Sequence, residues 1–143
     1  MKASDYIAKF LEINGIKFAF GMSGGAILHL VDSLYNKTSI EVISGSNEQF
    51  SAFEADGYAR ALNCENPGIC FSTSGPGATN LITGIASAYY DSIPIIVFTG
   101  QVARHRQKRN LNVRQLGFQE LPISSMIAPI VKATYKPENA NEL

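Results

Sequence analysis

The sequence predicts an α/β domain of three layers, in which a mostly parallel sheet has helices on both faces. Along the whole chain, short apolar segments alternate with segments whose apolar residues recur at helical spacing. The short segments lack an alternating polar face, which is typical of parallel strands that are buried on both sides. We expect residues 1–143 to form one domain, and the polar end at 136–143 resembles a domain boundary or a cut, so we expect a fragment of a longer chain.

The first half of the chain contains three predicted helices and two strands. Apolar residues from 6 to 13 predict a helix, and Ser4 or Asp5 can cap it. Residues 18–20 predict a strand, residues 27–34 the apolar face of a helix, and residues 40–43 a second strand. A third helix begins near Glu48, with Ser46 or Asn47 as its cap.

The second half continues the alternation. Residues 69–72 predict a third strand, and a glycine-rich turn at 73–80 opens a helix that reaches residue 89. The apolar run at 94–99 predicts a central parallel strand that is covered on both faces. A long basic loop at 101–115 then precedes a short helix at 121–126, and residues 127–133 predict a last strand, interrupted by Pro129.

Composition excludes several classes of protein. With 45% hydrophobic and 17% charged residues the chain is typical of globular proteins, and its zero net charge gives no overall attraction for nucleic acid or anionic membranes. The apolar runs are too short to span a bilayer. Cys64 and Cys70 are too few for a disulfide framework or a zinc cluster, and we expect Cys70 in the core. No signal peptide is visible at the N-terminus, so we expect a cytoplasmic protein.

Four turns follow predicted strands, at 21–25, 45–48, 73–80 and from residue 100 onward. In open α/β sheets ligands bind at this edge, where glycines allow close approach and helix N-termini present free N–H groups. Each turn alone is also explained by tight packing of a helix on a strand. No complete Gly-x-Gly-x-x-Gly or Gly-Lys-Ser/Thr motif is present, which disfavours a flavodoxin-like nucleotide-binding domain.

Glu48 lies at the entrance of its predicted helix. On spacing alone, the simpler interpretation is that its charge complements the positive end of the helix dipole. The motifs around it favour a chemical role instead. Asn-Glu-Gln at 47–49 is followed by Ala-Asp-Gly-Tyr-Ala-Arg at 55–60 and by Thr-Ser-Gly-Pro-Gly-Ala-Thr-Asn-Leu at 73–81. Asp-Ser-Ile-Pro-Ile at 91–95, Thr-Gly-Gln-Val at 99–102 and Phe-Gln-Glu at 118–120 complete the set.

In this order the motifs resemble acetolactate synthase and, more widely, the pyruvate-oxidase-like branch of the thiamine-diphosphate enzymes, over essentially the whole chain. The resemblance implies the first, pyrimidine-binding domain of such an enzyme. It makes Glu48 the catalytic acid that bonds the pyrimidine N1′ and favours the imino form of the 4′-amino group. Such an acid must keep or share its proton, and Phe50, Ala52 and Phe53 are the candidates for its apolar surroundings. The helix N-terminus favours the anion, but we expect burial to have the larger effect once the cofactor is bound.

The resemblance also implies the other site residues. The cofactor-binding residues would be Ser23, Gly24, Gly25, Glu48, Thr73, Pro76, Asn80 and Gln119. Phe118 would face the substrate channel, although it could also be an ordinary core aromatic. Arg104 is our candidate for an anionic substrate, because five of the twelve basic residues lie between 104 and 114. A solvated loop is the simpler explanation of that cluster.

The partners implied by the resemblance lie outside the chain. A second domain, in the same gene or in a separate chain, would bind the diphosphate and Mg²⁺ through a Gly-Asp-Gly motif that this sequence lacks. The substrate would be a 2-oxo acid such as pyruvate, the enzyme a homodimer or higher homo-oligomer, and this chain alone inactive. The family also permits flavin, for which no motif is present.

Two departures leave the reaction open. Asn47 replaces a histidine that often precedes the glutamate of this family, and the segment at 101–118 is longer and more basic than its counterpart and lacks the usual Gly-Thr-Asp. We therefore expect carboligation or decarboxylation, with an acceptor preference different from that of acetolactate synthases. A non-catalytic association domain of the same fold is the alternative.

Overall fold

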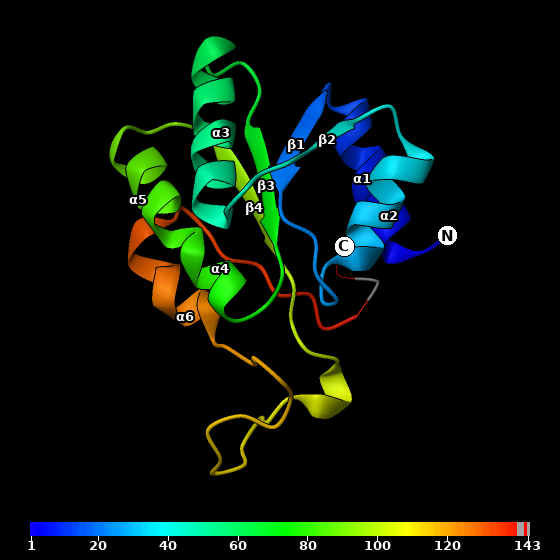
Figure 1. Cartoon of the computed structure of the whole chain (residues 1–143), viewed down its shortest axis with the longest axis vertical. Coiled ribbons are helices and arrows are strands. Elements are labelled where there is room, and N and C mark those ends of the chain that lie inside the picture. The colour runs from blue at the N-terminus through cyan, green and yellow to red at the C-terminus, as the bar shows by residue number, and fades with distance from the viewer. Residues whose placement is uncertain (140–141, 143) are drawn as a thin grey trace.

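A four-stranded parallel sheet forms the centre of the protein (Figure 1). A computed structural model describes residues 1–139 and 142. The strands β1 (Phe18–Gly21), β2 (Glu41–Ser44), β3 (Gly68–Ser72) and β4 (Ile95–Thr99) lie in the order β2-β1-β3-β4. Every neighbouring pair is parallel, with Phe20 of β1 opposite both Ile43 of β2 and Cys70 of β3. The carboxyl ends of all four strands therefore meet at one edge.

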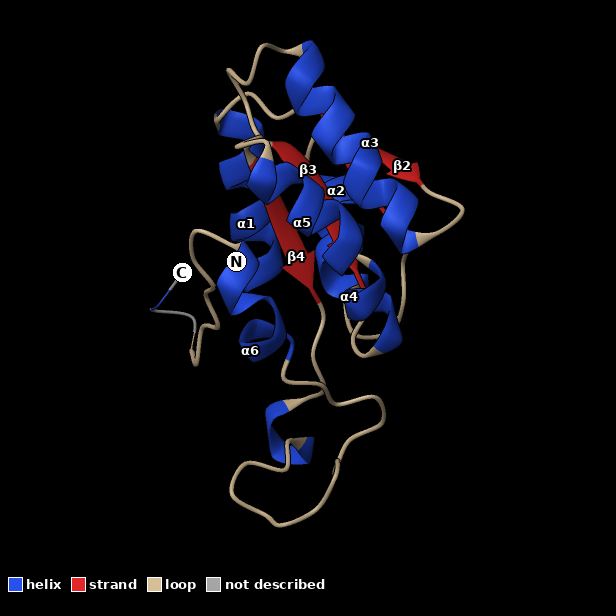
Figure 2. Cartoon of the chain, turned by 90° about the vertical axis from the view of Figure 1, so that its left-hand side faces the viewer, coloured by secondary structure: helices blue, strands red, loops and turns tan. Residues whose placement is uncertain are grey.

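Helices cover both faces of the sheet, so the predicted three-layer α/β domain is confirmed (Figures 1 and 2). One face carries α1 (Ala3–Ile13) and α2 (Leu28–Lys37), and the other carries α3 (Glu48–Ala61) and α5 (Ile82–Tyr90). The remaining helices are short: α4 (Pro76–Asn80), α6 (Ile123–Ile127) and two 3₁₀ turns, η1 (Arg104–Arg106) and η2 (Ala128–Ile130).

Two apolar clusters hold these layers together. The cluster under α1 and α2 includes Leu34 and the β3 residues Ile69 and Phe71, all within 1% of full burial. The cluster under α3 and α5 includes Cys70 and Leu81, both fully buried. Alternate residues of β3 thus point into opposite layers, as its unbroken apolar pattern requires. The expected core position of Cys70 is confirmed, and burial raises the pKa of its thiol to about 12.

The sequence predicted that the run at 94–99 forms a central strand, and this prediction is wrong. It forms β4, which lies at the end of the sheet and pairs only with β3. Ile96 consequently remains 40% exposed. An apolar run indicates a strand, but strand order depends on contacts between distant segments and is not encoded in the run itself.

The predicted strand at 127–133 is also wrong. Ile127 ends α6, and the 3₁₀ turn η2 follows, with Pro129 near its start. Proline has no N–H to give to a sheet ladder, whereas its fixed φ suits the first turn of a helix. Ile130 and Val131 are partly buried, because they pack against the cluster under α3 and α5. The predicted short helix at 121–126 is confirmed as α6, and the loop at 101–115 is interrupted only by η1.

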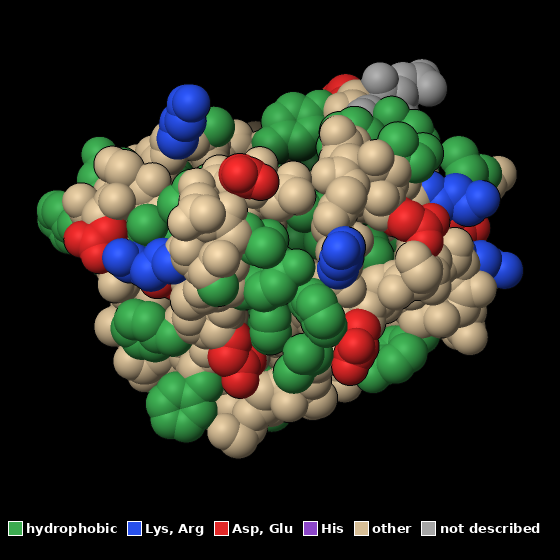
Figure 3. All heavy atoms as spheres, turned by 90° about the horizontal axis from the view of Figure 1, so that it is seen from above, with side chains coloured by type: hydrophobic (Ala, Val, Ile, Leu, Met, Phe, Trp, Pro, Cys, Tyr) green, Lys and Arg blue, Asp and Glu red, His purple; other side chains and the backbone are tan. Residues whose placement is uncertain are grey.

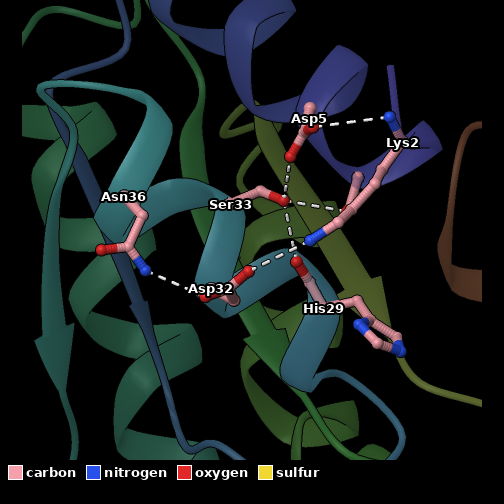
Figure 4. Close-up of polar contacts among 7 residues, drawn as sticks. Lys2, Asp5, His29, Asp32, Ser33 and Asn36 are labelled. Carbon is pink, nitrogen blue, oxygen red and sulfur yellow. Dashed lines mark hydrogen bonds and ion pairs between the residues drawn. The ribbon is translucent and has the colours of Figure 1, made fainter.

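A buried serine joins α1 to α2 (Figure 4). Ser33 Oγ lies 2.8 Å from both Ser4 Oγ and Asp5 Oδ1 and 2.9 Å from the carbonyl oxygen of His29. The Ser33 hydroxyl has one proton to donate, to Asp5 or to the His29 carbonyl, and it can accept from the Ser4 hydroxyl, so it is well satisfied in its buried position. This contact fixes α2, and with it the turn that precedes α2, relative to α1.

The far end of α3 is anchored by an ion-pair network. Arg60 Nε contacts Asp56 Oδ1 at 2.6 Å within α3, and Arg60 Nη2 contacts Asp91 Oδ2 at 2.6 Å, just after α5. These hydrogen bonds, above all the one to Asp56, raise the pKa of Arg60. The network holds α3 beside α5, which limits how far the start of α3 can move.

Candidate active site at the carboxyl edge of the sheet

The four strand-end turns meet at one edge, at the lower end of the sheet in Figure 1. The turns after β1 and β2 are joined by a hydrogen bond of 3.3 Å from the Gly45 amide to the Gly21 carbonyl. Those after β3 and β4 are joined by a bond of 2.9 Å from the Gly100 amide to the Ser72 carbonyl. The convergence that the sequence predicted is therefore present.

Glu48 is the first residue of α3 and lies at this edge. Of its two predicted caps, Asn47 is the one that acts: its Oδ1 accepts a 2.7 Å hydrogen bond from the Gln49 amide. The Glu48 carboxylate is half-buried, and its Oε2 accepts a 2.9 Å bond from Asn80 Nδ2 at the end of α4. The structure thus joins the predicted catalytic acid to a predicted cofactor-binding residue.

Gly77 provides space beside this carboxylate. A Cβ atom on Gly77 would lie 3.1 Å from Glu48 Oε1 and 2.9 Å from Thr73 Cγ2. These separations are too short for ordinary contact, so only glycine leaves the carboxylate and Thr73 where they are. Pro76 is the first residue of α4 and is exposed, and Gly75 precedes it with a φ of +63°. Such a φ favours glycine, and it sets the sharp turn from β3 into α4.

The turn after β1 reaches the same place through Gly24. A Cβ atom there would lie 2.6 Å from Thr73 Cβ and 2.7 Å from Thr73 Oγ1. Gly25 has no neighbour within 4 Å of such an atom, and Ser23 is exposed. Gly24 and Thr73 are therefore packed together, whereas Ser23 and Gly25 lie on the open side of the turn.

Gln119 is brought to the edge from the basic loop. A Cβ atom on Gly75 would lie 2.6 Å from Gln119 Cβ, so Gln119 packs directly on the turn that starts α4. Phe118 beside it is 80% exposed and is not a core aromatic. The interpretation of Phe118 as an ordinary core residue is therefore wrong, and its side chain remains open to a ligand or another surface.

Arg104 lies apart from the Glu48 group. Its Nη2 pairs with Glu138 Oε2 at 2.9 Å, and its Nη1 donates to the Glu138 carbonyl. It lines an open hollow of about 630 Å³ whose walls are the loop residues Arg104, His105, Gln107, Lys108, Arg109, Asn110, Leu111 and Leu116. Among the contacts of the described residues, Arg104 is joined to Glu138 and not to Glu48.

The expected surroundings of Glu48 need correction. Phe50 is 56% exposed and Phe53 is 39% exposed, so neither ring encloses the carboxylate. Ala52 is fully buried in the cluster under α3 and α5, where a Cβ atom on Gly84 of α5 would lie 2.4 Å from the Cβ of Ala52. Residues that follow Glu48 in the sequence turn around the helix, and their apolar character alone does not show which side they face.

Sequence reasoning did not identify the residues that shape the basic loop. Glu120 accepts hydrogen bonds from the amides of Lys108 and Leu116, and Gln101 bonds the carbonyl of Leu121. Both belong to motifs on which the resemblance depends, Phe-Gln-Glu and Thr-Gly-Gln-Val. That position was the only available signal, because contacts across a loop of this length have no local pattern.

Comparison with known proteins agrees with this geometry. Residues 1–126 match the family described as thiamine pyrophosphate enzyme, N-terminal TPP binding domain. The chain belongs to this family. The match covers all four turns of the site, and it disfavours the flavodoxin-like alternative.

Curated relatives are similar over almost all of this TPP-binding domain. It is 41% identical to the probable acetolactate synthase large subunit of Methanocaldococcus jannaschii over 143 residues, 100% of this chain and 23% of that protein. It is 41% identical to the acetolactate synthase large subunit of Lactococcus lactis over 133 residues, 93% of this chain and 22% of that protein. The chloroplastic acetolactate synthase of Arabidopsis thaliana is 39% identical over 137 residues, 94% of this chain and 19% of that protein. The chain thus spans about a fifth of the length of these relatives.

Within residues 1–139 and 142, no helix is long and apolar enough to cross a membrane. The same residues contain no group of three or more His, Cys, Asp or Glu side chains that could hold a metal ion.

Proposed function

We propose that this domain is the pyrimidine-binding module of a thiamine-diphosphate-dependent enzyme that acts on a 2-oxo acid, with acetolactate synthase-like carboligation or decarboxylation as the reaction. The observation that carries the proposal is the Glu48 carboxylate, held by Asn80 beside Gly77 at the edge where four turns meet. Membership of the TPP-binding family and the acetolactate synthase relatives support it.

The residues present fit the aminopyrimidine. Asn80 holds Glu48 Oε2, and no hydrogen bond joins Oε1 to another residue in the described part of the chain. Oε1 faces the space that the missing side chain of Gly77 leaves. We propose that Oε1 bonds the pyrimidine N1′ there and holds the shared proton, while Asn80 keeps the carboxyl group in orientation.

The cofactor, when bound, supplies a thiazolium carbon that adds to the carbonyl group of a 2-oxo acid. The chain's own residues would bind and orient its pyrimidine. We assign this role to Ser23, Gly24, Gly25, Thr73, Pro76, Asn80 and Gln119, and catalysis to Glu48. Phe118, which is 80% exposed, would face the substrate, and Arg104 would attract its carboxylate at longer range. Because Arg104 is paired with Glu138, we propose that it attracts the substrate at a distance and does not bind it directly.

The remaining parts of the enzyme are proposed by analogy with the family. Mg²⁺ and the diphosphate would be bound by a second domain in the same gene or in a separate chain. The enzyme would be a homodimer or higher homo-oligomer in the cytoplasm, without nucleic-acid or membrane partners. The free cysteines Cys64 and Cys70 suit a reducing compartment. A purely associative domain is less favoured, because association alone would not need a carboxylate held open beside a glycine.

Two measurements test this function. The domain should bind thiamine diphosphate with Mg²⁺ weakly or not at all in a calorimetric titration, and tight binding would show that the division of labour between domains is wrong. A protein that also carries the diphosphate-binding domain should consume pyruvate and release CO₂ only when the cofactor and Mg²⁺ are added. Absence of turnover with pyruvate and with other 2-oxo acids, despite bound cofactor, would refute the proposal.

A further inference from the structure

The carboxylate of Glu120 ties together the two ends of the basic loop. Its Oε1 accepts a 2.8 Å hydrogen bond from the Lys108 amide, and its Oε2 accepts from the same amide at 3.0 Å and from the Leu116 amide at 3.1 Å. Lys108 and Leu116 lie at the two ends of the segment 108–116. One side chain therefore closes a loop that contains no helix or strand.

The neck of the loop is closed by a second set of contacts. Gln101 Nε2 donates to the Leu121 carbonyl at 2.7 Å, and Gln101 Oε1 accepts from the Val102 amide at 2.9 Å. Gly117 has no room for a side chain, since a Cβ atom there would lie 2.9 Å from both the Arg106 carbonyl oxygen and Val102 Cβ. The backbone on either side of Phe118 and Gln119 is thus fixed.

Gln119 lies between these fixed points in an unfavourable conformation. Its φ of +58° is in the left-handed region, which a residue with a side chain adopts only when its surroundings hold it there. The surroundings are identifiable: Glu120 follows it, and its Cβ packs on the turn at Gly75, which leads into the helix that carries Asn80. Asn63, Cys64, Ser92 and Arg109 also have a positive φ, so the φ of Gln119 supports a role in the site only together with its packing on Gly75.

We propose that Glu120 is a positioning residue that closes the loop 108–116 and thereby holds Gln119 against Gly75, on the cofactor side of the site. The link to the cofactor rests on the proposed function, whereas the loop closure does not. The charge state of Glu120 supports this role. Hydrogen bonding from the Leu116 amide lowers the pKa of Glu120 below its ordinary value of 4.5, and the Lys108 amide and ammonium group add to this effect against the opposing effect of burial.

Amide-resolved hydrogen exchange tests the closure in the wild-type protein. The amides of Lys108 and Leu116 should exchange slowly, because they donate to Glu120. Those of Arg114 and Gln115 should exchange fast, because within the described residues they donate no hydrogen bond. Exchange of Lys108 and Leu116 as fast as that of Arg114 would overturn the proposal.

The variant Glu120→Gln tests the role of the carboxylate, with Glu65→Gln, an exposed glutamate far along the chain, as the matched control. In Glu120→Gln the Lys108 and Leu116 amides should exchange at least about tenfold faster, since bonds to charged groups are the stronger ones. Amides of the buried strand β3 should keep their rates in both variants. Unchanged loop exchange in Glu120→Gln would overturn the proposal. If the β3 amides also exchange faster, the variant is destabilised as a whole. Loop closure is then judged from the wild-type protein, by the exchange of Lys108 and Leu116 relative to Arg114.

The link to the site is tested by titrating thiamine diphosphate with Mg²⁺ into the protein that also carries the diphosphate-binding domain. Glu120→Gln should weaken binding about tenfold, and Glu65→Gln should leave it unchanged. Faster loop exchange with unaltered cofactor binding would overturn the positioning role. If even the wild-type protein binds no cofactor while exchange responds as expected, the proposed function fails and the loop closure by Glu120 stands.

Discussion

The side-chain amide of Asn80 donates a 2.9 Å hydrogen bond to Glu48 Oε2, across 32 residues of sequence. Glu48 is the first residue of α3, and Asn80 is the last of α4. The two helices follow different strands, and the parallel sheet brings them to the same edge. Neither side chain is fully buried, so the bond fixes the carboxyl group without removing it from a ligand's reach.

Replacing Asn80 should therefore impair the site more than the fold. In Asn80→Ala, Glu48 loses the donor that orients it, and turnover of a protein with both domains should fall about 10- to 100-fold, the range expected for one hydrogen bond to a charged group. Initial rates with a 2-oxo acid measure this. Asn36→Ala, which removes an exposed bond to Asp32, is the control and should leave the rates unchanged.

Gly77 should not tolerate even a methyl group. In Gly77→Ala the new Cβ would lie 2.9 Å from Thr73 Cγ2 and 3.1 Å from Glu48 Oε1, so stability should fall by about 1–3 kcal/mol and cofactor binding should weaken. Urea unfolding and cofactor titration measure the two effects. Gly57→Ala in α3 is the matched control: a Cβ there meets nothing within 4 Å, and stability should rise by about 0.5–1 kcal/mol. Equal responses of the two variants would contradict the steric argument.

The buried contact of Ser33 should contribute measurably to stability. Ser33→Ala removes the hydroxyl that joins α2 to Asp5 of α1 and should lower the free energy of unfolding by about 1 kcal/mol. Ser125→Ala, at an exposed position of α6, should have almost no effect. Urea unfolding of both variants measures the difference. A Ser33→Ala protein as stable as wild type would show that the hydrogen bonds of Ser33 do not stabilise the packing of α2 on α1.

Stability should decrease in acid. Hydrogen bonding from Ser33 lowers the pKa of Asp5 below 3.8, and hydrogen bonding from the backbone and side chain of Ser39 lowers the pKa of Glu12 below 4.5. Glu120 behaves in the same way. These carboxylates bind protons more readily in the unfolded chain, so their contribution is complete above about pH 4.5 and is lost as the pH falls through the lower folded values. The urea midpoint should therefore fall between pH 5 and pH 3, less steeply in Glu12→Gln; a constant midpoint would contradict this.

At the end of the molecule away from the strand-end turns, the distribution of charge on the surface does not indicate a binding partner. Seen from above, Lys and Arg side chains alternate with Asp and Glu side chains and do not gather by sign (Figure 3). The loop at 104–114 is the exception, because five of the twelve basic residues of the chain are concentrated in it. Salt dependence of substrate affinity should distinguish steering by this loop from simple solvation.

Most elements of the fold and the edge of the sheet at which the turns meet could be predicted, because both depend on local patterns. Helical and strand spacing is visible in the sequence, and glycine-rich turns after strands mark the binding edge, whereas the roles of Glu48, Thr73 and Asn80 are implied by the resemblance to acetolactate synthase. The position of β4 at the end of the sheet was not predictable, since it depends on which strand pairs with which. For the segment at 127–133, apolar content suggested a strand, but Pro129 favours a turn.

Loop contacts lay beyond sequence reasoning for a different reason. Glu120 reaches Lys108 across 12 residues with no regular structure between them, so no periodicity connects the two. Likewise, the apolar character of Phe50 and Phe53 did not reveal that both rings are exposed, because burial depends on what packs over α3.

The most direct measurement is the turnover of Glu48→Gln in a protein that carries both this domain and its diphosphate-binding domain. Glutamine keeps the shape of the side chain and a carbonyl oxygen that can accept from Asn80, but its amide has no acidic proton to transfer to or share with the pyrimidine. Glu54→Gln, on an exposed position of the same helix, is the control. The account predicts that Glu48→Gln binds thiamine diphosphate and loses all turnover of the 2-oxo acid, while Glu54→Gln retains it. A Glu48→Gln protein with most of the wild-type activity would contradict the central claim.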